Sequence, residues 1–179
     1  MLYASRLFQK AVPPVLSFAL GSLGFLTKFD FESHETTLLH MFGDAGVPLG
    51  LRLRFEGTIM RSLPRPGPRN LQAELLGAEN EGEPTHTPSG TRVVLNEVVV
   101  DRGPNPSMAT MELFANNEFL TSVAADGVCV ATPTGSTAYS LAAGGGLCHP
   151  ALPGMLVLPH APPPFPPTPD CLLVRKRAD

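Results

Sequence analysis

Apolar and polar residues recur with different periods along the chain, and these periods predict an order of elements. Residues 2–9 fit one short helix, which Pro13 and Pro14 close because proline lacks the amide donor that a helix needs. Residues 15–20 are apolar almost throughout and predict a strand that is buried on both faces, as in parallel sheets. Residues 32–42 follow a helical period. The first 45 residues therefore predict alternating strands and helices.

Strand patterns dominate the middle of the chain. Residues 51–56 alternate strictly between apolar and charged side chains, which is typical of a strand with one solvent-exposed face. Residues 93–100 are rich in β-branched side chains and are interrupted by the polar pair Asn96 and Glu97. Three more strands are expected over 108–114, 118–123 and 126–132, with a tight hairpin turn at Asn116 and Asn117 between the first two.

Proline and glycine mark two irregular segments. Residues 63–90 carry many of both and few large apolar side chains, so we expect a long, mobile loop between strands. Residues 159–179 form a proline-rich tail. Because proline cannot donate to a helix or a central strand, this tail predicts polyproline II or disorder. A proline-rich ligand for a small recognition domain is the alternative interpretation.

Charge and cysteine content narrow the class of protein. The 179-residue chain has a net charge of −3, which gives no general attraction to nucleic acid or to anionic membranes. No apolar run approaches the roughly 20 residues that span a bilayer. The three cysteines are widely spaced and favour a reducing compartment over a disulfide framework. We therefore expect a cytoplasmic protein whose partners include neither nucleic acid nor a membrane.

The residues that follow the strand 126–132 form the most distinctive candidate site. Pro133 and Gly135 turn the chain, and a helical pattern then runs from Ser136 to Ala143. The first amides of a helix lack partners and carry partial positive charge, so a phosphate or a ribose hydroxyl can bind there. Ser136 or Thr134 can equally serve as a plain helix cap. Physical reasoning leaves both interpretations open.

Asn96 and Glu97 form the second candidate site. Neighbouring strand residues point to opposite faces, so both cannot face solvent on a half-buried strand. Burying an amide or a carboxylate is unfavourable unless it has partners, and a ligand with hydroxyl and amino groups would supply them. Taken alone, Asp126 and Gly127 fit an ordinary turn before a strand. Neither a serine-hydrolase elbow nor a paired-histidine zinc motif is found in the sequence.

Four motifs, in this order, resemble the NAD kinase family. They are Gly21-Ser22-Leu23-Gly24-Phe25-Leu26-Thr27, Leu95-Asn96-Glu97-Val98, Asp126-Gly127 and Thr132-Pro133-Thr134-Gly135-Ser136-Thr137-Ala138-Tyr139-Ser140. The similarity covers residues 1 to about 158, and the sequence around the motifs looks closest to that of animal cytosolic NAD kinases. The resemblance implies ATP-dependent phosphorylation of the 2′-hydroxyl of the adenosine ribose of NAD to give NADP. It also implies Mg²⁺ with ATP as a divalent metal, and no tightly bound organic cofactor.

The resemblance further implies a mixed α+β or α/β fold in two parts. Residues 1–45 would be the end of an N-terminal α/β nucleotide-binding domain. Residues 46–158 would form an incomplete, β-rich and sandwich-like NAD-binding domain, followed by a disordered tail over 159–179. The resemblance also implies that NAD binds between the two domains and that the complete protein is a homo-oligomer, as members of the family usually are.

Matched positions imply roles for individual residues. Asn96 and Glu97 would contact the substrate, Asp126 would lie on the nicotinamide side, and Phe25 would lie near the substrate. The remaining substrate-binding residues, of which the last four would line the adenosine portion, are Ser136, Thr137, Ala138, Tyr139 and Ser140. No residue of the chain is assigned a metal.

The family's Gly-Gly-Asp-Gly-Thr loop, whose aspartate takes the proton from the 2′-hydroxyl, would fall before Met1. No catalytic residue is therefore assigned within the chain, which we expect to be truncated at both ends relative to the family. Phosphoryl transfer depends on positioning and on stabilising phosphate charge, so we expect little kinase activity from this chain alone. The alternative function is a catalytically inactive fragment that binds NAD or associates with full-length subunits.

Overall fold

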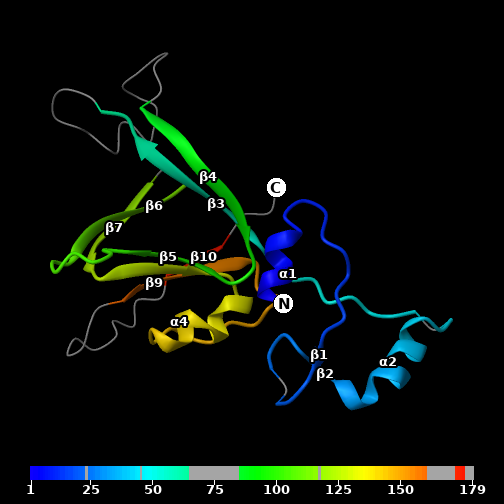
Figure 1. The fold of residues 1–179 in the computed structure, drawn as a ribbon. Coiled ribbons are helices and arrows are strands. Elements are labelled where there is room, and N and C mark those ends of the chain that lie inside the picture. The colour runs from blue at the N-terminus through cyan, green and yellow to red at the C-terminus, as the bar shows by residue number, and fades with distance from the viewer. Residues whose placement is uncertain (23, 45, 65–84, 117, 161–171, 176–179) are drawn as a thin grey trace.

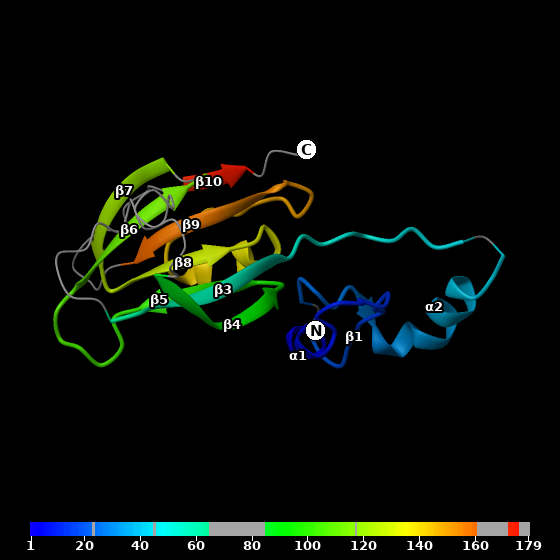
Figure 2. The same ribbon diagram turned by 90° about the horizontal axis from the view of Figure 1, so that it is seen from above.

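The computed structural model describes residues 1–22, 24–44, 46–64, 85–116, 118–160 and 172–175. The N-terminal part contains short elements that lie beside the strands (Figures 1 and 2). Its helices are α1 (Leu2–Leu7), a 3-10 turn η1 (Phe31–Ser33) and α2 (His34–Met41). Between them, β1 (Phe18–Ala19) and β2 (Phe29–Asp30) pair in parallel. The predicted helices are thus confirmed.

The prediction of a buried strand over 15–20 is wrong. Only two of these residues pair, and their one partner in the described chain is β2. Val15 is 48% exposed and Leu20 is 86% exposed, because no described layer covers both faces of so short a pair. The apolar side of α2 is exposed as well, since Leu39 and Phe42 are 76% and 81% accessible to solvent.

A long antiparallel pair, β3 (Phe55–Ser62) and β4 (His86–Val94), follows. The strand predicted over 51–56 begins four residues later than expected. The loop expected over 63–90 is replaced by β4 from His86 onward, and its residues 65–84 lie outside the described part of the chain. The proline in β4, Pro88, lies next to a register shift between Ile59 and Met60. Proline is tolerated at such a bulge, because the ladder bond that it cannot make is already interrupted there.

A four-stranded antiparallel sheet holds the core. Its strands, in spatial order, are β10 (Leu172–Arg175), β9 (Gly154–His160), β8 (Gly127–Ala131) and β5 (Glu97–Asp101). Cys129 and Ala131 of β8 pack with Leu156 and Leu158 of β9 in the buried cluster. The break predicted at Asn96 and Glu97 lies one residue earlier, at Leu95 and Asn96, since β4 ends at Val94 and Glu97 is already the first residue of β5.

The predicted hairpin is confirmed. β6 (Ala109–Ala115) and β7 (Glu118–Ala125) pair antiparallel, and Asn116 in the turn adopts a φ of 50°, a backbone conformation that asparagine tolerates. In Figure 1 this hairpin lies above the four-stranded sheet, while α4 (Tyr139–Ala142) lies below it. Mixed α/β content with a predominance of sheet is therefore the observed fold class.

The prediction of a disordered tail from residue 159 is wrong at two places. β9 continues through Pro159 to His160, and β10 adds a strand at its side, whereas residues 161–171 and 176–179 lie outside the described chain. β10 pairs only with 154–157, so among the described residues Pro159 has one neighbouring strand, β8. A proline that has a neighbouring strand on only one side can be accommodated in a sheet, because no strand on the other side needs its missing N–H.

The helical pattern predicted over 136–143 is interrupted. A 3-10 turn, η2 (Thr134–Thr137), is followed at Ala138 by a non-helical residue with φ −106° and ψ −124°, and only then by the short α4. None of the helices in the described parts of the chain is long and apolar enough to cross a lipid bilayer.

Candidate functional site

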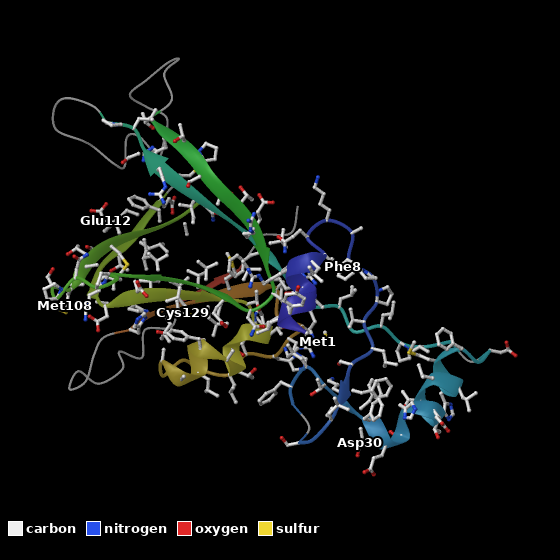
Figure 3. The ribbon with its side chains drawn as sticks, in the orientation of Figure 1. Met1, Phe8, Asp30, Met108, Glu112 and Cys129 are labelled. Atoms are coloured by element: carbon white, nitrogen blue, oxygen red, sulfur yellow. The ribbon has the colours of Figure 1, made fainter. Side chains whose placement is uncertain are left out.

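The candidate site lies where the end of β8 meets the turn between β4 and β5. In the antiparallel register Glu97, the first residue of β5, is opposite Ala131, the last residue of β8. The segment 132–140 leaves β8 at this point, next to Asn96. Cys129, labelled in Figure 3, lies in β8 just before it, above α4. Pairing of two strands thus brings the two candidate sites of the sequence together.

Thr132 joins the two segments. Its backbone N–H donates to the carbonyl of Asn96 at 2.8 Å, and its hydroxyl donates to the carbonyl of Leu95 at 2.5 Å. The same hydroxyl oxygen accepts the N–H of Gly135 at 3.0 Å. Because Thr132 is fully buried, these bonds are shielded from competing water.

Gly135 is the point of closest approach. A Cβ at this position would lie 2.4 Å from the carbonyl oxygen of Asn96 and 2.6 Å from its carbonyl carbon. Glycine is required here because the neighbouring atoms are backbone and have no rotamer by which to withdraw.

The structure contradicts one of the two roles that the sequence position of Ser136 left open, that of a helix cap. No side-chain cap is present at η2 or α4. Its fully buried hydroxyl instead donates to the carbonyl of Pro133 at 2.7 Å and accepts the N–H of Cys148 at 3.0 Å. Ser136 therefore fastens the loop after α4 to the motif, and its hydroxyl is occupied within the protein.

Several buried oxygen atoms around this junction have no hydrogen-bond partner among the described residues. They are Oδ1 of Asn96, Oε2 of Glu97, Oγ1 of Thr134 and Oγ of Ser140. Burial also raises the pKa of Glu97 above its usual value. A buried polar atom without a partner is unfavourable by about 1–3 kcal/mol, so such atoms are rare unless water or a ligand reaches them. All four residues belong to the segments 95–97 and 132–140, which meet where β5 pairs with β8, and buried, unpartnered oxygens on adjoining segments are typical of a polar binding site.

Tyr139 points away from this junction. Its hydroxyl lies 3.4 Å from Nε2 of His160, and the two rings meet edge to face with centroids 5.7 Å apart. The carbonyl of His160 in turn accepts the N–H of Asp126 at 3.0 Å. Tyr139 is thus connected to the opposite end of β8. Thr137 is the last residue of η2, Ala138 separates η2 from α4, and both are half-buried.

Asp126 and Phe25 are not at the junction. Asp126 precedes the first residue of β8, roughly 16 Å along an extended strand from Ala131. It forms a partly buried ion pair with Arg102, whose Nε lies 2.6 Å from Oδ1. Phe25 lies between β1 and β2 and is 70% exposed. In the described residues its ring makes none of the aromatic contacts seen for its neighbours Phe18, Phe29 and Phe31.

Sequence reasoning missed several residues that shape this region. Arg102 carried no motif, and His160 was assigned to the proline-rich tail. No pattern in the sequence marks the hydrogen bond between the backbone N–H of Cys148 and the hydroxyl of Ser136. No three His, Cys, Asp or Glu side chains gather in the described parts of the chain.

Comparison with known proteins identifies the family. Residues 1–45 match the model of the ATP-NAD kinase N-terminal domain, and residues 95–169 match that of the ATP-NAD kinase C-terminal domain. An uncharacterized kinase of Schizosaccharomyces pombe is 48% identical over 160 residues, which are 89% of this chain and 40% of that protein. The NAD(+) kinase of Saccharomyces cerevisiae is 41% identical over 167 residues, 90% of this chain and 29% of that protein.

Solved structures agree. The crystal structure of yeast NADH kinase complexed with NADH superposes with a TM-score of 0.72 at 31% identity, over 97% of this chain and 44% of that one. An NAD kinase from Archaeoglobus fulgidus in complex with ATP shares the fold, with a TM-score of 0.58 at 24% identity, over 91% of this chain and 52% of that one. The chain thus spans less than half the length of the Schizosaccharomyces pombe and Saccharomyces cerevisiae relatives. The two domain models together match more than half of the residues, and the chain belongs to the ATP-NAD kinase family.

Proposed function

We propose that the protein is an NAD kinase, which transfers a phosphoryl group from ATP to the 2′-hydroxyl of the adenosine ribose of NAD and gives NADP. This chain contributes residues that hold the dinucleotide. The observation that carries the proposal is the cluster of buried, unpartnered oxygens on Asn96, Glu97, Thr134 and Ser140. The family match and the likeness to a kinase solved with NADH support it.

The chemistry of the cluster fits the adenosine half of a dinucleotide. An ionised carboxylate and the carbonyl of an amide only accept hydrogen bonds, whereas serine and threonine hydroxyls can donate or accept. Adenosine offers the matching donors in its two ribose hydroxyls and its amino group. A donor that reaches Glu97 stabilises the ionised carboxylate and thus opposes the rise in its pKa that burial causes.

Magnesium enters the proposal only as part of the substrate Mg–ATP. The described residues hold no cluster of three His, Cys, Asp or Glu that would bind a resident metal, so we derive no step through one. The donor hydroxyl, the phosphates and their charge must all be positioned for transfer. The part of that work that these residues can perform is to orient the ribose.

The remaining parts of the proposal have their own support. A cytoplasmic location is supported by the sparse, widely spaced cysteines. Homo-oligomerisation is supported by the resemblance to a family of oligomers. Assignment to the animal cytosolic type is supported by the amino-acid sequence around the four motifs, although the two relatives compared in sequence are fungal. Asp126 and Phe25 belong to the substrate site in this proposal on the same motif match.

Binding is tested by thermal unfolding of the purified chain with increasing NAD. At 100 times the dissociation constant, a ligand that binds only the folded state stabilises it by about 2.7 kcal/mol, which raises the midpoint by several degrees. Glu97→Gln should weaken NAD binding about tenfold or more, because a hydrogen bond to a charged group contributes roughly 1.5–3 kcal/mol. Glu56→Gln, on an exposed position of β3, is the matched control and should bind as the parent does.

Turnover is tested separately with NAD, ATP and magnesium. NADP formation supports the full proposal, whereas binding without turnover favours the alternative in which this chain binds NAD without transferring phosphate. A midpoint that does not respond to NAD, in a chain shown to be folded, would refute the dinucleotide site.

A further inference from the structure

Gln9, just beyond α1, binds β4 in the way a neighbouring strand would. Its Oε1 accepts the backbone N–H of Val93 at 2.8 Å, and its Nε2 donates to the carbonyl of Val93 at 3.1 Å. The side-chain amide thus pairs with both backbone groups of one residue that is 84 positions away in sequence. Nε2 also donates to the carbonyl of Ser5, in α1, at 3.1 Å.

Arg54, the residue just before β3, also binds the end of α1. Its guanidinium donates to the carbonyl of Phe8 at 2.8 Å and reaches the carbonyl of Ser5 at 3.5 Å. These carbonyls lie at the C-terminal end of the helix, where partial negative charge favours a cation. Arg54 directly precedes Phe55, which pairs with Val94, so both contacts lie at the same end of the β3–β4 pair.

We name Gln9, Arg54 and the backbone of Val93 the α1 clasp. Figure 3 shows α1, between the labelled Met1 and Phe8, lying against this end of β4. Leu95, two residues beyond Val93, lines a small apolar cavity together with residues of α1 and Arg54.

The clasp is linked to the candidate site through a short path. The carbonyl of Leu95 accepts the hydroxyl of Thr132, and the carbonyl of Asn96 accepts its N–H. Leu95, which lies between Val93 and Asn96, is only 6% exposed and is closely packed. A displacement of the backbone at Val93 should therefore be passed on to Asn96, because the packing leaves little room for Leu95 to adjust.

We propose that Gln9 and Arg54 are positioning residues, which fix the place of Asn96 and Glu97 by tying the end of β4 to the N-terminal segment. This inference rests on the proposed function in so far as the site positioned is the dinucleotide site. Neither residue touches the unpartnered oxygens; both act through the backbone of β4 and its turn.

The test replaces Gln9 by methionine, which has a similar length and none of the hydrogen-bonding groups of the amide. Lys10→Met, at the exposed neighbouring position, is the matched control. We expect Gln9→Met to speed amide exchange at least fivefold at Val93 and also at Thr132, whose N–H donates to Asn96. Faster exchange at Val93 alone would overturn the proposal, because the α1 clasp would then stabilise only the end of β4 and not the turn at Asn96.

The second measurement is NAD affinity, well below the unfolding midpoint of every variant. Gln9→Met should raise the dissociation constant at least fivefold, and Lys10→Met should leave it unchanged. The effect of Gln9→Met should shrink when Asn96→Ala is already present, since the two changes act along one path. A dissociation constant within twofold of the parent, or full additivity with Asn96→Ala, would overturn the proposal.

The two hypotheses fail in different ways. If the parent chain binds no NAD, the proposed function is wrong, and the exchange rates at Val93 and Thr132 still decide whether the clasp acts on the turn. If the parent binds NAD and Gln9→Met binds it equally well, the proposed function stands and the positioning role is wrong.

Discussion

Gly135→Ala is the change that probes the junction most directly. A Cβ at this position would lie 2.4, 2.6 and 2.9 Å from the O, C and Cα atoms of Asn96, all closer than carbon atoms tolerate. Because the obstructing atoms are backbone, either the turn before β5 or the segment after β8 must move. The bonds from Thr132 to Leu95 and Asn96 then lengthen as well.

Overpacking of this kind destabilises by about 1–3 kcal/mol. The loss of backbone freedom in the unfolded chain offsets about 0.4–1 kcal/mol of that. For a chain of this size 1 kcal/mol corresponds to roughly 2–4 °C, so we expect the unfolding midpoint to fall by several degrees. NAD affinity should fall with it, since the displaced residue is Asn96.

Differential scanning calorimetry of the parent and the variant measures the shift, with Gly146→Ala as the control. Gly146 belongs to the glycine run after α4, and an added Cβ there would meet no heavy atom within 4 Å. Its substitution should leave the midpoint unchanged or raise it slightly. Equal midpoints for Gly135→Ala and Gly146→Ala would refute the argument that close approach of the two segments requires glycine at position 135.

Three further predictions follow from burial. Ser136→Ala leaves the buried N–H of Cys148 without its acceptor and should destabilise by about 1–3 kcal/mol in urea titrations; a change below about 0.5 kcal/mol, the size of an ordinary surface effect, would contradict this. Burial raises the pKa of Glu97, so its ionisation weakens the unliganded fold as pH rises through the folded pKa. Without ligand, Glu97→Gln should therefore match the parent below about pH 4.5 and be more stable at pH 7; a gap that narrows with rising pH would refute this. Burial, and then the charge of Glu97, raise the pKa of Cys129 to about 11. Iodoacetamide at pH 8 should therefore label Cys148 before Cys129, which mass spectrometry of the peptides would show. Prompt labelling of Cys129 in the folded chain would contradict its burial.

Strand and hairpin patterns were predictable where the information is local. The β6–β7 turn follows from asparagine's tolerance of positive φ. The polar pair Asn96 and Glu97 within an apolar run indicates the interruption between β4 and β5 to within one residue. Predictions failed where a partner decided the outcome. β4 includes Pro88 because a bulge accommodates it, and β9 includes Pro159 because that position has one neighbouring strand. The strand predicted over 15–20 is only two residues long in the structure, because only two residues of β2 pair with it.

The sequence by itself determined the family and the residue types of the candidate site, because motifs are a property of order along the chain. Only the tertiary structure decided how those residues are used. It showed that the hydroxyl of Ser136 is hydrogen-bonded to the backbone of Cys148. Unpartnered buried oxygens remain on Asn96, Glu97, Thr134 and Ser140. The physical reason is that burial and hydrogen bonding depend on the register of β5 against β8, which a distant pairing sets and no local pattern encodes.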